Sequence, residues 1–191
     1  DLSTGVPFDG PNNYPTGVAI PSLSKTELLD VLKQAGFPTV KLYYPFPDHL
    51  LPQMIYTDEY PPGQELFERL YVYQVNQDSL VIDIYKLYEQ FVSNGLILFF
   101  ANSFLAECSN GGGSQVLYSA VSAERKKEES FSTVIFKDGT VEKRPLYTEG
   151  IKGLKRLSEN LRELKARGIP VISYRLENGR LVMPKVPAPT L

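Results

Sequence analysis

The chain has little of the chemistry on which many enzymes depend: it contains one histidine, one cysteine and no tryptophan among 191 residues. Cys108 has no second cysteine to pair with, which excludes an internal disulfide framework and predicts a reducing compartment. A Ser-His-Asp triad or a multi-histidine metal site would have to use His49 alone. We therefore do not expect an independent hydrolase.

Long apolar runs and an excess of basic residues are also missing. The longest apolar candidate, Leu96 to Phe100, is far shorter than the about 20 residues of a membrane-spanning helix. The net charge is -2 and the isoelectric point about 5.6, so we expect neither nucleic acid nor an anionic membrane as a partner. Asp1 to Gly5 include no initiator methionine and do not resemble a signal peptide. These features predict a cytoplasmic piece of a longer polypeptide.

The hydrophobic periodicity predicts an α+β fold, with mixed or antiparallel strands and hairpins packed with about three helices. Ser24 and Glu27 fit a capping box at the start of the first helix, and Gly36 fits its end. Asp138-Gly139 and Asn178-Gly179 are typical of hairpin turns. The expected helices are 24–36, 79–93 and 148–167, and the expected strands are 39–44, 96–108, 115–123, 130–136, 140–144, 171–176 and 180–186. We place a boundary near residues 108–115, which divides the chain into segments 1–108 and 115–191.

Lys143 is the cation most suggestive of a site. It follows Val141 by two residues on an expected strand, and the next helix carries Glu149, Glu159 and Glu163. A strand lysine, a helix glutamate and then a hairpin follow the order of a protein-kinase amino-terminal lobe, where the lysine holds the α/β-phosphates and the glutamate orients it. Surface charge on a hairpin and on an exposed helix face is the alternative.

Two other segments have both a functional and a structural interpretation. The turn from Ser109 to Ser114 contains three glycines, Gly111 to Gly113. These glycines would let backbone N–H groups approach a phosphate. Alternatively, the turn is a plain hairpin tip. An aromatic cluster near the prolines would form a groove for a sugar or a partner, or would pack an irregular loop. Its candidate substrate-binding members are Tyr43, Tyr44, Phe46 and Tyr56.

Several motifs together resemble the end of a bacterial class I S-adenosylmethionine-dependent methyltransferase domain of the kind found in surface-polysaccharide biosynthesis. They are Phe8-Asp9-Gly10, Asn13-Tyr14, the segment 24–37, Lys41 to Asp48, Thr57 to Tyr60 and Gly95 to Cys108. From Gln115 onward the chain is similar to the start of a kinase-like domain. The resemblance covers most of the chain.

This resemblance implies a segment of a methyltransferase/kinase-like transferase that is not catalytic by itself. It implies S-adenosylmethionine binding only with upstream sequence, because the family's glycine-rich cofactor turn has no match here. It implies that Lys143 contacts the phosphates of Mg-ATP with Glu159 as its helix partner, although Glu163 fits about as well. It also implies the rest of a larger polypeptide or a glycan-biosynthesis protein as partner. The alternative is a protein-interaction module without a small-molecule site, which docks a partner through the aromatic-proline region or an exposed strand edge.

Overall fold

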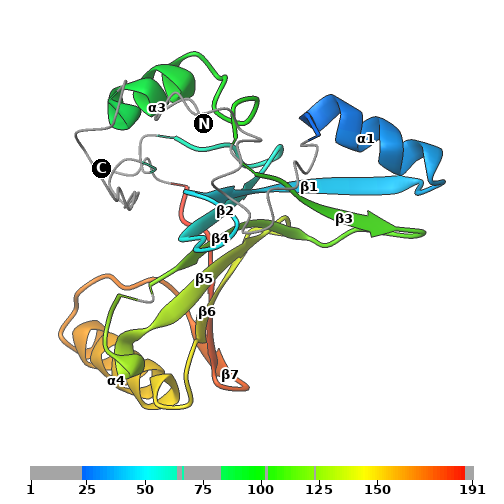
Figure 1. Cartoon of the computed structure of the whole chain (residues 1–191). Coiled ribbons are helices and arrows are strands. Elements are labelled where there is room, and N and C mark those ends of the chain that lie inside the picture. The colour runs from blue at the N-terminus through cyan, green and yellow to red at the C-terminus, as the bar shows by residue number, and fades with distance from the viewer. Residues whose placement is uncertain (1–22, 64–65, 67–82, 102, 123, 188–191) are drawn as a thin grey trace.

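The fold is α+β, as the sequence predicts. A computed structural model describes residues 23–63, 66, 83–101, 103–122 and 124–187. Within these residues, eight strands form one sheet of antiparallel pairs in the order β3-β1-β2-β4-β5-β6-β8-β7. Three α-helices in the described part of the chain accompany the sheet, with α1 (Lys25–Gln34) and α4 (Gly150–Ala166) near its opposite ends and α3 (Ile84–Ser93) between them (Figure 1).

The helix α1 begins and ends where local signals place it. Ser24 Oγ accepts a hydrogen bond from the Glu27 amide, and the Glu27 carboxylate accepts one from the Ser24 amide, so the predicted capping box is confirmed. Gly36 follows the last turn with a φ of 86°, a conformation that suits glycine. No residue of α1 is fully buried, and its partly buried residues Leu28 and Leu29 pack against the hydrophobic core.

One face of the sheet carries the main core. Strands β1 (Thr39–Phe46), β2 (Met54–Thr57) and β4 (Val116–Val121) are neighbours, so their alternate side chains meet on this face. Phe46 packs edge-on against Tyr56 and against Tyr88 of α3. The buried cluster comprises Leu42, Tyr44, Phe46, Met54, Tyr56, Leu66, Tyr88, Ile97, Tyr118 and Ala120.

The segment 96–108, which the sequence predicts to be one strand, is only partly a strand. Its strand is β3 (Leu105–Ser109), which pairs with β1 at the edge of the sheet. Residues 97–100 form turns after α3, where the Leu96 amide donates to the Phe91 carbonyl and the Phe100 ring stacks on Phe91. The prediction for the first part is wrong because a short apolar run is buried equally well in a turn that packs on the core.

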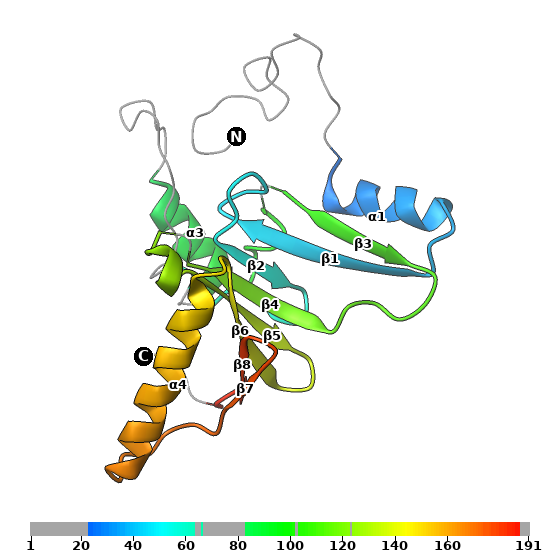
Figure 2. The same ribbon diagram turned by 90° about the horizontal axis from the view of Figure 1, so that it is seen from below.

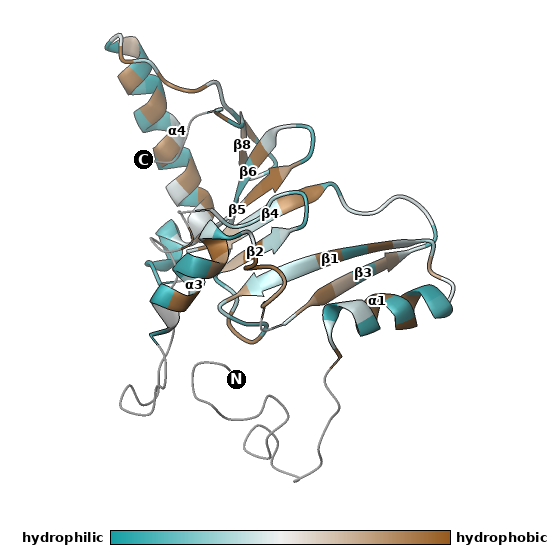
Figure 3. Ribbon diagram, turned by 90° about the horizontal axis from the view of Figure 1, so that it is seen from above, coloured by the Kyte–Doolittle hydropathy of each residue, from teal (hydrophilic) through white to brown (hydrophobic). Residues whose placement is uncertain are grey.

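The remaining strands form two hairpins, and a long helix packs against them. The first hairpin joins β5 (Phe131–Phe136) to β6 (Thr140–Pro145) through Asp138-Gly139, and the second joins β7 (Arg175–Glu177) to β8 (Arg180–Pro184) through Asn178-Gly179. Both predicted turns are confirmed, and Asn178 and Gly179 both have positive φ, as a two-residue hairpin turn of type I′ requires. The helix α4 packs on this part of the sheet (Figure 2). Polar and apolar residues alternate around α4, so it is amphipathic (Figure 3).

The predicted boundary at 108–115 coincides with the connection between β3 and β4. Across it the sheet continues, because β2 pairs with β4 through Met54 and Ala120 and through Ile55 and Ser119. The aromatic core also spans both segments, since Tyr56 of β2 contacts Tyr118 of β4 with ring centroids 5.0 Å apart.

Candidate functional site

Lys143 lies on the face of the sheet that α4 covers. It pairs with Thr133 of β5 and Leu181 of β8, so it occupies the centre of the hairpin sheet. Its ammonium lies 5.7 Å from the centroid of the Phe131 ring, at a distance typical of a cation–π contact. The same ring approaches α4 at Gly153. Lys143 is half-buried, and its contact with the Phe131 ring places its ammonium on the side of the sheet where α4 packs.

The structure does not bring Glu159 against Lys143. The buried positions of α4 are Gly150, Gly153, Leu154 and Ser158, and Glu159 lies on an exposed flank. Glu163 forms an ion pair with Arg167. The ion pairs within the described residues therefore do not include one between Lys143 and either glutamate.

The connection between β4 and β5 is fastened to α4. It contains the short helix η3 (Lys127–Glu129) and Ser130, whose fully buried hydroxyl contacts the carbonyls of Arg125 and Lys126 at 2.9 and 3.0 Å. The side chain of Arg156 on α4 donates to Glu129 at 3.1 Å. A Cβ atom on Gly153 would lie 1.9 Å from the Glu128 carbonyl oxygen, so only glycine permits this approach.

The aromatic residues expected to bind substrate belong to the core. Tyr44, Phe46 and Tyr56 are at most 1% exposed, which is the packing alternative rather than a groove. The Tyr44 hydroxyl donates to Asp58 at 2.7 Å, and burial together with this hydrogen bond raises the pKa of Tyr44 above its ordinary value. Tyr43 points to the other face of the sheet, where it donates to Glu107 at 2.6 Å.

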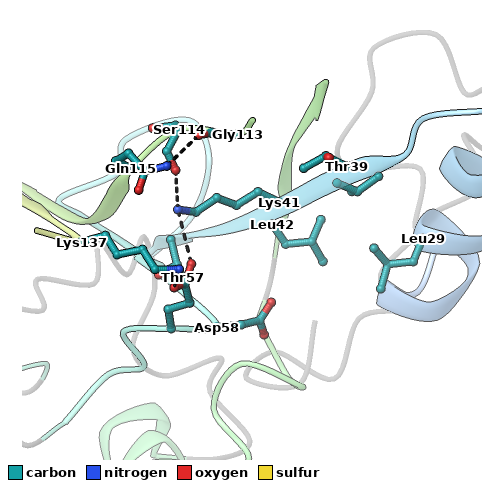
Figure 4. A pocket seen from close by; sticks show the side chains of 12 residues that line it. Leu29, Thr39, Lys41, Leu42, Thr57, Asp58, Gly113, Ser114, Gln115 and Lys137 are labelled. Carbon is teal, nitrogen blue, oxygen red and sulfur yellow. Dashed lines mark hydrogen bonds and ion pairs between the residues drawn. The ribbon is translucent and has the colours of Figure 1, made fainter. Parts of the chain in front are cut away.

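A cleft of about 420 Å³ opens beside the first half of β1. It lies where β2 ends, because β2 pairs with β1 only from Tyr43 to Phe46. Figure 4 shows Lys41 reaching from β1 toward Ser114, while Leu42 lies toward Leu29 of α1. The lining residues are Leu29, Thr39, Val40, Lys41, Leu42, Thr57, Asp58, Glu59, Gly113, Ser114, Gln115 and Lys137.

Two lysines and a glutamate hold the cleft together. Lys41 donates to the carbonyls of Ser114 at 2.9 Å and Val116 at 2.6 Å, and its ammonium lies 3.8 Å from Glu59. Lys137 pairs with the other oxygen of Glu59 at 2.6 Å and lowers the pKa of that carboxyl. The sequence does not predict this cluster, because a single lysine within β1 does not indicate a partner more than 70 residues away.

The glycine-rich turn already holds a carboxylate of the chain. Glu107 Oε1 accepts the Ser114 amide at 2.8 Å, and the Gly111 amide donates to Ser109 Oγ at 3.0 Å. Hydrogen bonds from Tyr43 and then from the Ser114 amide lower the pKa of Glu107. Two of the turn's amides are therefore bound to the chain's own oxygens, in positions where a phosphate would need them.

The Tyr43–Glu107 pair predicts a pH dependence of stability. Burial and the bond to Glu107 raise the pKa of Tyr43 to about 12, so its contribution is complete below pH ~10 and is lost as pH rises from ~10 toward 12. The lowered pKa of Glu107 makes its contribution complete at neutral pH and lost as pH falls below its ordinary range. Tyr43→Phe should cost about 1 kcal/mol at pH 7 and flatten the stability profile at both ends. Urea unfolding from pH 3 to 11 tests this, with the exposed Tyr147→Phe as control; an unchanged profile in Tyr43→Phe would contradict the assignment.

Comparisons with known proteins identify no relative. No protein-family model, no curated protein and no solved structure matches the chain. Among the described residues, no cluster of three or more His, Cys, Asp or Glu side chains is placed to hold a metal ion. No helix in the described part of the chain combines the length and apolarity needed to cross a bilayer.

Proposed function

We propose that residues 115–191 form a kinase-like module that holds the phosphates of ATP. In this proposal the chain is a cytoplasmic segment of a bacterial methyltransferase/kinase-like transferase of surface-glycan biosynthesis. Residues 1–108 are its methyltransferase-tail-like accessory part. The segment acts with the rest of a longer polypeptide or with a glycan-biosynthesis partner, and it binds S-adenosylmethionine only with upstream sequence.

The observation that carries the proposal is the order and pairing of the elements. Three consecutive antiparallel strands, β4, β5 and β6, are followed by α4 and then by β7 and β8, with β8 returning beside β6. The amino-terminal lobe of a protein kinase has this order, and its third strand carries the lysine that contacts the α/β-phosphates. Lys143 occupies the third strand here, on the helix-covered face.

The site differs from a protein kinase in two ways that shape the proposal. The sequence of the connection 122–130 has no glycine, and in its described part Glu129 accepts a hydrogen bond from Arg156 of α4, so residues 124–130 are held against the helix. In this proposal the Phe131 ring, whose centroid lies 5.7 Å from the Lys143 ammonium, is one contact that positions the lysine, whereas Glu163 pairs with Arg167. Lys143 is the residue proposed to contact the phosphates, and we assign no catalytic residue.

Thermal unfolding with and without millimolar Mg-ATP tests the proposal. A ligand at ~100 times its dissociation constant stabilises the folded state by roughly 2.7 kcal/mol, which raises Tm by about 5–10 °C for a chain of this size. We expect this shift in the wild type and its loss in Lys143→Ala. Arg144→Ala is the matched control, because Arg144 is the next residue of β6 and lies on the opposite face, paired with Glu142.

S-adenosylmethionine serves as the ligand control and should leave Tm unchanged. A shift with Mg-ATP that survives in Lys143→Ala would place the nucleotide elsewhere. The absence of any shift in the wild type at 10 mM Mg-ATP would contradict the proposed function, subject only to confirming that the protein is folded by circular dichroism.

A further inference from the structure

The lysine in the cleft beside β1 has an unused hydrogen-bond donor. An ammonium group has three N–H donors, and Lys41 gives two of them to the carbonyls of Ser114 and Val116 (Figure 4). Glu59 Oε1 lies 3.8 Å from Nζ, which is too far for a direct hydrogen bond. The Tyr43 ring, with its centroid 5.5 Å from Nζ, offers a cation–π contact but no lone pair. Among the described residues, the third N–H of Lys41 therefore has no acceptor at hydrogen-bond distance.

Two carboxylates that line the cleft have unused acceptor oxygens. Glu59 receives Lys137 on Oε2 at 2.6 Å, and its Oε1 is the atom that stays 3.8 Å from the other ammonium. Asp58 receives two hydrogen bonds on Oδ1, from the Tyr44 hydroxyl at 2.7 Å and from the first lysine of α1 at 2.9 Å. Its Oδ2 has no partner within the described part of the chain. The side chains of Asp58 and Glu59 are 55% and 44% exposed, so a ligand in the cleft can reach them.

The spacing of the Lys41 and Glu59 atoms fits one hydroxyl group between them. An oxygen about 2.8 Å from each atom forms two hydrogen bonds of normal length, and this arrangement closes across a separation of 3.8 Å. Such an oxygen has to accept from the ammonium and donate to the carboxylate. A hydroxyl does both, whereas a ligand carboxylate only accepts and a ligand ammonium only donates. The unused Oδ2 of Asp58 can accept from a second hydroxyl.

The charges around the cleft disfavour an ionic ligand. Lys41 and Lys137 both lie beside Glu59, and Asp58 pairs with the first lysine of α1. The hydrogen bond from Lys137 lowers the pKa of Glu59, so this carboxyl is ionised at neutral pH. An anion that approaches the two lysines is repelled by Glu59, and a cation that approaches the carboxylates is repelled by the lysines. A neutral ligand with several hydroxyl groups avoids both repulsions.

We propose that this cleft binds a neutral hexopyranoside, with one hydroxyl bridging Lys41 and Glu59 and another donating to Asp58. Its volume of about 420 Å³ lies within the range of about 300–1,000 Å³ that is common for small-molecule sites. Leu29 and Val40 are half-buried in the lining and supply apolar contacts for the C–H groups of the ring. An open-chain polyol carries the same hydroxyls but loses more conformational freedom on binding than a ring. The proposal does not depend on the nucleotide site.

The test is a titration of the ¹⁵N-labelled chain, followed by its amide NMR signals. The probes are the methyl pyranosides of glucose, galactose and mannose. We expect at least one of them to give saturable shifts of the amides of Lys41, Glu59 and Ser114. The same glycoside with every hydroxyl methylated cannot donate to either carboxylate and should give no saturable shift. Inorganic phosphate is the anionic comparison and should not shift these amides in the wild type.

A substitution at Glu59 tests the bridging hydroxyl. Glu59→Ala removes the acceptor from a half-exposed position, so the affinity for the glycoside should fall at least 10-fold. Glu89→Ala is the matched control because it removes the same charge from an exposed position of α3 that does not line the cleft. Its affinity should change less than 3-fold. If Glu59→Ala does not fold, the methylated glycoside on the wild type still decides the result.

Four results would overturn the proposal. The first is the absence of a saturable shift with all three glycosides, and the second is equal binding of the methylated glycoside. The third is an equal loss of affinity in the Glu59 and Glu89 variants. The fourth is tighter binding of inorganic phosphate than of any glycoside at the same amides of the wild type, which would make the cleft an anion site.

Discussion

Replacing Gly153 by alanine should lower the free energy of unfolding by about 2–3 kcal/mol. A Cβ at this position would lie 1.9 Å from the Glu128 carbonyl oxygen and 3.1 Å from Phe131 Cζ. Alanine favours a helix by about 1 kcal/mol over glycine, but the obstruction comes from backbone that Ser130 and Arg156 hold in place. The clash therefore outweighs the gain in helix propensity, and α4 has to move away from the sheet.

Chemical denaturation measures this loss. Gly111→Ala is the matched control, because a Cβ there meets nothing within 4 Å, and it should change stability by less than about 0.5 kcal/mol. A Gly153→Ala protein as stable as the wild type would show that α4 does not lie this close to the β4–β5 connection. The close packing of strand, connection and helix around Lys143 would then need revision.

Replacing Lys41 by methionine should cost about 2–3 kcal/mol. The Lys41 side chain is 14% exposed, and its ammonium donates to the carbonyls of Ser114 in the β3–β4 connection and of Val116 at the start of β4. Methionine keeps most of the aliphatic contact but leaves both carbonyls without their donor, at a cost of about 1–3 kcal/mol for an unsatisfied buried group. The β3–β4 connection should also become less protected from amide exchange.

The matched control is Lys137→Met, because Lys137 also pairs with Glu59 but is 59% exposed. An exposed ion pair contributes about 0–1 kcal/mol, so this variant should remain close to the wild type. Equal effects of the two substitutions would contradict the role assigned to Lys41, since the pair with Glu59 would then account for both.

The sequence was most informative where a structure depends on neighbouring residues. The capping box at Ser24 and the Asp138-Gly139 and Asn178-Gly179 turns are local, so their residue types alone predict them. Alternation along β6 also places Lys143 correctly on the face of Val141. The apolar segment 96–108 misleads because hydrophobicity predicts burial without distinguishing a strand from a turn.

The cleft beside β1 and the attachment of the β4–β5 connection to α4 both depend on contacts between residues far apart in the sequence. Lys41 and Ser114 are 73 positions apart, and nothing local to either residue indicates the other. The role of Gly153 is equally hard to predict. A glycine inside a helix indicates that another part of the chain comes close to the helix, but the sequence does not show that this part is Glu128, which belongs to a separate element. Tyr44, Phe46 and Tyr56 look like a binding surface in sequence, and only the register of β1, β2 and β4 places them in the core.

The central claim is that Lys143 lies at the phosphates of a bound nucleotide, and labelling with an acyl-phosphate derivative of ATP tests it most directly. The amine of a lysine beside the phosphates attacks the acyl carbon and forms an amide, while the nucleotide leaves as its phosphate, so mass spectrometry identifies the residue. We expect labelling of Lys143 that excess Mg-ATP abolishes, above the background at the exposed Lys152. Labelling of Lys143 no greater than that of Lys152, or unaffected by Mg-ATP, would contradict the claim.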